Sequence, residues 1–118
     1  MDLLKLIKSF RYAFYGIFTA LTEQNLKIHF VSAVVVIIAG FFTGLSISEW
    51  LVIILLIALV ISTEMVNTAI ETVVNLVSPE FHPLAKKAKD VAAGAVLVFA
   101  IASAIIGLLI FIPKWFEQ

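Results

Sequence analysis

The chain has no cysteine, few charged residues and few glycines, and each shortage excludes a class of function. Without cysteine there are no disulfides, no thiolate nucleophiles and no cysteine-ligated metals. Only 14% of the 118 residues are charged and the formal net charge is zero, so the basic field typical of nucleic-acid binding is absent. No cleavable signal peptide is expected from the N-terminal pattern.

Glycine is also too scattered to build a familiar nucleotide site. The five glycines form no G-x-x-x-x-G-K-[ST] loop, and the signatures of soluble kinase folds are missing. Any ATP site in this chain must therefore use a metal ion, lysines and the surfaces of helices.

Apolar residues are abundant, which predicts an integral membrane protein. They make up 63% of the chain, and the mean hydropathy is +1.15. A membrane-spanning helix needs about 20 apolar residues. We expect an all-α membrane protein of one domain, 1–118, with an amphipathic surface helix at 1–22 and membrane helices at 26–45, 48–77 and 91–112. The polar residues just before Phe30 should begin the first membrane helix.

Two prolines lie on either side of the expected third membrane helix, 91–112. Pro83 lies in a charged connection, residues 80–90, where it can open a short helix at its first turn. Pro113 is expected to close the third apolar run. Between these prolines, the small residues from Ala92 to Ala95 would allow a neighbouring helix to approach closely.

Basic residues predict the orientation in the membrane. They precede the first membrane helix and fill the connection between the second and third, at Lys5, Lys8, Arg11, Lys27, Lys86, Lys87 and Lys89. The positive-inside rule then places the N-terminus and this connection in the cytoplasm and the C-terminus outside.

The second membrane helix carries a polar stripe within an apolar run. Glu64, Asn67, Glu71 and Asn75 are spaced three, four and four residues apart, so a helix presents them on one face. Ionisable groups at membrane depth usually serve chemistry or transport. We expect partner subunits to cover the stripe, because three helices cannot readily enclose it. The alternatives are a solvated helix end for Glu71 and Asn75, and a structural interhelical hydrogen bond for Glu64.

The acidic residues at the cytoplasmic face are suited to phosphoryl transfer. They are Glu23, Glu64, Glu71 and Asp90, and several lysines accompany them. Magnesium binds through one or two carboxylates together with substrate phosphates. A carboxylate at the depth of a lipid hydroxyl can accept that hydroxyl's proton during attack on a phosphoryl group. The simpler reading of the lysines is that they set topology, and His82 alone is more often a loop residue than a ligand.

These residues resemble a known family. The run Glu64-Met-Val-Asn67-Thr-Ala-Ile-Glu71, followed by Ala88-Lys89-Asp90, resembles the small bacterial integral-membrane diacylglycerol kinases and undecaprenol kinases. The E-x-x-N-[ST]-A-I-E motif with a later A-K-D is highly specific. Thr22-Glu23-Gln24-Asn25 and the segment 10–16 also fit, so the resemblance covers nearly the whole chain.

The resemblance implies an ATP- and Mg²⁺-dependent transfer of the γ-phosphoryl group to a lipid alcohol, in a homotrimer with shared active sites. By position, Glu64 resembles the proton acceptor, with Asn67 beside it, and Glu23 and Glu71 resemble the metal ligands. The positions that resemble nucleotide contacts are Lys5, Tyr12, Glu80, His82, Lys89 and Asp90. Asn75 stands where the family usually has aspartate, which should alter a contact near the nucleotide.

The resemblance also bears on the substrate. The uninterrupted segment from His82 to Val98 and the C-terminal run from Ile105 to Lys114 are similar to the Gram-positive branch, which implies undecaprenol as substrate in a bacterial plasma membrane. The alternative within the family is a diacylglycerol kinase that makes phosphatidic acid. From other classes, an ion- or proton-coupled transporter and a purely structural helical oligomer stay open, since membrane carboxylates also form proton relays.

Overall fold

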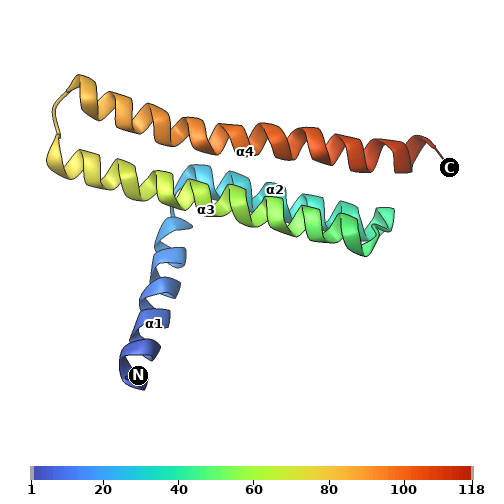
Figure 1. Ribbon diagram of the computed structural model, residues 1–118, viewed down its shortest axis with the longest axis horizontal. Helices are drawn as coiled ribbons and strands as arrows, with labels where there is room; N and C mark the ends of the chain where they lie inside the picture. The colour runs from blue at the N-terminus through green and yellow to red at the C-terminus, as the bar shows by residue number, and fades with distance from the viewer. Residues whose placement is uncertain (1, 118) are drawn as a thin grey trace.

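The computed structural model describes residues 2–117 and consists of four helices (Figure 1). These are α1, Leu3–Ala20; α2, Gln24–Thr43; α3, Ile47–Val77; and α4, Pro83–Phe116. The last three are long and apolar enough to cross a membrane. The expected all-α architecture with three membrane helices is therefore confirmed.

Local signals in the sequence set the helix ends. The Asp2 carboxylate accepts hydrogen bonds from the backbone N–H groups of Leu4 and Lys5, which caps α1. Gly44 ends α2 with φ of 80°, a left-handed conformation that glycine adopts without steric cost. Ser46 and Glu49 then form a capping box that starts α3. The polar residues before Phe30 do begin α2, as predicted.

The third membrane helix is longer than the sequence predicts, which corrects both proline assignments. Pro83 opens the whole of α4 rather than a short separate helix, because its missing N–H is not needed in a first helical turn. Most of the expected connection at 80–90 is therefore helical, and the expected span at 91–112 lies inside α4. Pro113 does not end the helix, which continues to Phe116.

The helices α2, α3 and α4 run side by side, with α3 packed against both of the others (Figure 1). The contact between α2 and α4 is much smaller. The N-terminal helix α1 turns away from this bundle at the start of α2, and its large apolar side chains stay exposed. The hairpin of α3 and α4 continues past that junction (Figure 1).

Polar and aromatic contacts tie the three long helices together at the end away from α1. Trp50 lies over Gly40, where a Cβ atom would come within 2.6 Å of the indole ring. Lys114 Nζ is 3.0 Å from Glu49 Oε1. The Trp115 indole N–H donates to Thr43 Oγ1 at 2.8 Å. These contacts hold the last turn of α4 in place beyond Pro113, which explains why the helix continues past the proline.

Candidate functional site

The deeper half of the polar stripe is buried on the inner face of α3. Glu64 and Asn67 are each 4% exposed, and they continue the buried stripe that begins with Ile53 and Val60. One chain therefore encloses this half, which corrects the expectation that covering it requires partner subunits. Enclosure is possible because α4 packs closely along α3, and α4 includes the small buried residue Ala92.

The buried Glu64 carboxylate has a histidine neighbour on α2. His29 Nε2 lies 3.8 Å from Glu64 Oε2, and the two side chains are 23% and 5% exposed. Sequence reasoning gave His29 no role. The signal that could have found it is that His29 is an ionisable residue within a predicted membrane helix. The same signal singled out the acids of α3.

Asn67 connects the buried and exposed halves of the stripe. Its Nδ2 donates to Glu71 Oε1 at 3.2 Å, while its Oδ1 is buried and has no hydrogen-bond partner within residues 2–117. The threonine hydroxyls of this part of α3 bond to backbone carbonyls one turn earlier, at Thr63, Thr68 and Thr72. The side-chain groups left available for a ligand are therefore the acids and amides of the stripe.

The proposed metal ligands lie on different helices. Glu71 is half-buried on α3, whereas Glu23 is the exposed N-cap residue of α2 and its side chain makes no capping bond. Across residues 2–117, no three acidic or histidine side chains cluster to form a complete metal site. The donors do suit magnesium, because that ion needs only one or two carboxylates when substrate phosphates supply further oxygens.

The predicted nucleotide contacts fall on two separate parts of the chain. Lys5 and Tyr12 lie on the exposed surface of α1, and the others lie on the α3–α4 hairpin, at Glu80, His82, Lys89 and Asp90. No hydrogen bond or ion pair joins the two groups among the described residues. Asn75 is exposed near the end of α3.

Two of the hairpin residues already have partners. The Nδ1 atom of His82 accepts a hydrogen bond from the backbone N–H of Leu84 at 3.1 Å, so His82 is the N-cap of α4. Asp90 forms an ion pair with Lys86 one turn earlier. Lys89 lies between His82 and Asp90 in the sequence, and it is half-buried.

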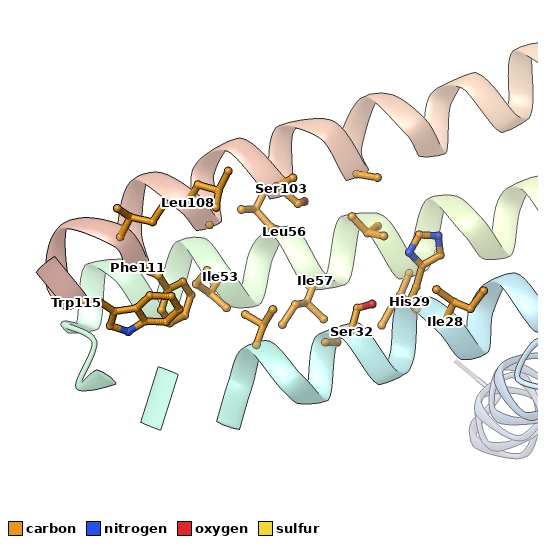
Figure 2. A pocket seen from close by; sticks show the side chains of 18 residues that line it. Ile28, His29, Ser32, Ile53, Leu56, Ile57, Ser103, Leu108, Phe111 and Trp115 are labelled. Carbon is orange, nitrogen blue, oxygen red and sulfur yellow. The ribbon is translucent and has the colours of Figure 1, made fainter. Parts of the chain in front are cut away.

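An apolar groove of about 600 Å³ runs along α3 between α2 and α4 (Figure 2). His29 lies at one end and Trp115 at the other, with Ser32 and Ser103 as further polar residues along its walls. Ligand pockets commonly measure about 300–1,000 Å³ and place a few polar groups in an apolar lining. The polar end of this groove is formed by His29, whose ring lies beside Glu64, although Glu64 does not itself line the groove.

These features define the class of protein: a multi-pass helical membrane protein with buried acid and amide groups near one end of the bundle and an apolar groove leading to them. The chain belongs to the prokaryotic diacylglycerol kinase family, whose model matches residues 11–111. It is thus a lipid kinase. Membership favours this activity over the transporter and the structural oligomer.

Similar proteins come from several bacteria. The chain is 54% identical to an undecaprenol kinase of Bacillus subtilis over 96% of its own length and 93% of the relative's. It is 44% identical to a diacylglycerol kinase of Synechocystis over 92% of its length, but spans only 63% of that protein. A diacylglycerol kinase of Helicobacter pylori is 35% identical over 80% of this chain and 74% of its own.

The capping role of His82 can be separated from a role in binding nucleotide. His82→Ala removes the acceptor for the Leu84 N–H and should cost about 1 kcal/mol of helix stability, whereas His82→Asn keeps a capping oxygen. Amide hydrogen exchange in the first turns of α4 should increase in the alanine variant alone.

ATP affinity measured on the same two variants completes the comparison. If His82 also contacts nucleotide, both variants bind ATP more weakly than the wild type. Weakening in the alanine variant alone would mean that His82 acts only as a cap.

Proposed function

We propose that this protein transfers the γ-phosphoryl group of ATP to a lipid alcohol in a Mg²⁺-dependent reaction, and that its principal substrate is undecaprenol, giving undecaprenyl phosphate. The observation that carries the proposal is the buried Glu64 carboxylate, which lies beside His29 at the polar end of an apolar groove. The high identity to a protein named undecaprenol kinase favours that alcohol. Diacylglycerol is the alternative acceptor, because other relatives are named for it.

Glu64 is the group proposed to accept the proton of the lipid hydroxyl. Burial strips water from the carboxylate, so an incoming hydroxyl is the hydrogen-bond donor that it lacks. As the hydroxyl oxygen forms its bond to the γ-phosphorus, its proton moves to Glu64 and the bond from phosphorus to ADP breaks. Asn67 holds the next acid along the stripe, through its hydrogen bond to Glu71.

Glu23 and Glu71 are proposed to hold the magnesium ion of the nucleotide. When bound, the ion would neutralise the charge of the phosphate oxygens. Asn67 fixes one oxygen of Glu71 and leaves the other for a ligand. The exposed carboxylate of Glu23 is not committed to capping α2, so it can turn toward a phosphate-bound ion.

Nucleotide binding is proposed to use Lys5 and Tyr12 from α1 together with residues of the α3–α4 hairpin, which are Glu80, His82, Lys89 and Asp90. Within a single chain these two groups make no contact with each other. A homotrimer with shared sites would allow α1 of one subunit to meet the hairpin of another. Asn75, in place of the usual acid, would make one contact near the nucleotide less negative.

The groove is proposed to hold the hydrocarbon tail of the substrate. It starts at His29, the neighbour of Glu64, and is almost entirely apolar, so a tail lying in it would leave the hydroxyl end near the carboxylate. The amphipathic α1 would lie in the membrane interface at the cytoplasmic side. We propose that the active site and the N-terminus lie at the cytoplasmic face of the bacterial plasma membrane and the C-terminus outside, because the positive-inside rule favours this orientation.

A lipid panel tests the activity and the substrate together. Purified protein in mixed micelles, given labelled ATP and Mg²⁺, should phosphorylate undecaprenol more efficiently than diacylglycerol, measured as kcat/KM. Glu64→Gln should lower kcat by about 10²- to 10⁴-fold, the usual contribution of a proton acceptor, while the folded protein keeps its ATP affinity. No transfer from the wild type to either alcohol would refute the proposed function.

The metal assignment predicts a different kinetic pattern. Glu23→Gln or Glu71→Gln removes one anionic oxygen ligand, so each variant should need a higher Mg²⁺ concentration for half-maximal ATP binding. Glu117→Gln, at the far end of the chain from these acids, serves as the control and should leave this concentration unchanged. An unaltered Mg²⁺ requirement in both test variants would contradict the assignment.

Filling the groove tests its role in binding the tail. A Cβ atom at Gly107 meets no atom within 4 Å, so Gly107→Leu should fold and project its side chain into the groove. We expect KM to rise about tenfold, or roughly 1.4 kcal/mol, for a long isoprenoid alcohol and to change little for a short-chain one. Gly107→Ala is the matched control. Equal losses for both chain lengths would place the tail elsewhere.

A further inference from the structure

His29 is a titratable group at the site to which the proposed reaction gives no task. It projects from α2 toward α3, and its Nε2 atom is 3.8 Å from Glu64 Oε2. It also forms the polar end of the groove between α2 and α4 (Figure 2). Its side chain is 23% exposed, whereas that of Glu64 is 5% exposed. His29 is therefore the more accessible member of the pair.

Each phosphorylation of an alcohol leaves a proton on a buried carboxylate, and this proton must be removed before the next turnover. The hydroxyl loses its proton, its oxygen forms the new bond to phosphorus, and the electron pair of the broken bond leaves on ADP. Glu64 must then return to its anionic form before the next turnover. Because its side chain is almost closed to solvent, direct release of the proton to water is obstructed.

We propose that His29 takes the proton from Glu64 and releases it toward water at the membrane surface. The inference rests on the proposed kinase function and adds a residue to it. The neutral Nε2 atom accepts the proton from the carboxylic acid of Glu64, and the resulting imidazolium then passes it to solvent. Histidine suits this task because its charge ordinarily changes between about pH 5 and pH 8. A separation of 3.8 Å is closed by a small side-chain rotation or by one bridging water.

Few other charged groups face His29. From α3, Glu64 is the one acid within ion-pair distance among the described residues. No charged side chain of α4 lines the groove, and the last turn of α1 contains no basic residue. On α2 itself, Lys27 is exposed. Glu64 is thus the charged group placed to exchange a proton with His29.

The test is the pH profile of His29→Gln. Glutamine can still hydrogen-bond to Glu64 but cannot carry a proton. We expect kcat to fall at least about tenfold with little change in either KM, and the acidic limb of the kcat profile to change shape, because Glu64 is then the one member of the pair that must lose a proton. Added imidazole should restore part of the lost rate. Lys27→Gln, which removes a neighbouring titratable group on the same helix, should behave as wild type.

Three results would overturn the inference. The first is a His29→Gln variant with wild-type rate and pH profile. The second is a folded variant that loses activity equally at every pH and gains nothing from imidazole, which would make His29 merely structural. The third is a loss of kcat in the Lys27→Gln control equal to that in His29→Gln. All three require an active wild type, so they differ from failure of the proposed function, in which the wild type phosphorylates no lipid alcohol.

Discussion

A carboxylate held inside an apolar bundle is the constraint on which the rest of this structure depends. An ionisable group at that depth is expensive, and it persists only where neighbours compensate for lost water. For Glu64 the neighbour is His29 of α2, while the adjacent amide of Asn67 bonds to Glu71. The pairing of Glu64 with His29 requires α2 to pack against α3 at this level, whereas the hydrogen bond of Asn67 to Glu71 lies within α3 itself.

At the opposite end of the bundle, side-chain contacts hold the three long helices together. The ion pair of Lys114 with Glu49 and the hydrogen bond of Trp115 to Thr43 join α4 to the turn between α2 and α3. Between the two polar ends, α2 and α4 diverge over α3 and leave the groove open. A lipid kinase needs such an arrangement, since its substrate is part hydrocarbon and part alcohol and the two parts require different surroundings.

The proposed lipid site and the proposed nucleotide site lie on different parts of the long α3–α4 hairpin. Its continuation past the start of α2 carries acids and lysines beyond the apolar bundle (Figure 1). Nucleotide and metal are water-soluble, and under the proposed function the charged groups of the hairpin would bind them where the proposed lipid site ends. His82 shows that these residues also shape the fold, because it caps the helix that carries Lys89 and Asp90.

The sequence by itself determined the helices, because apolar length, capping residues and glycine act locally along the chain. It also determined the polar face of α3, since residues three and four apart in a helix must share a face. Only the tertiary structure decided that one chain buries Glu64 and Asn67, that His29 meets Glu64, and that α4 runs unbroken from Pro83 to Phe116. These outcomes depend on how closely α2 and α4 approach α3, and the contacts that set this approach join residues far apart in sequence, which periodicity along one helix does not encode.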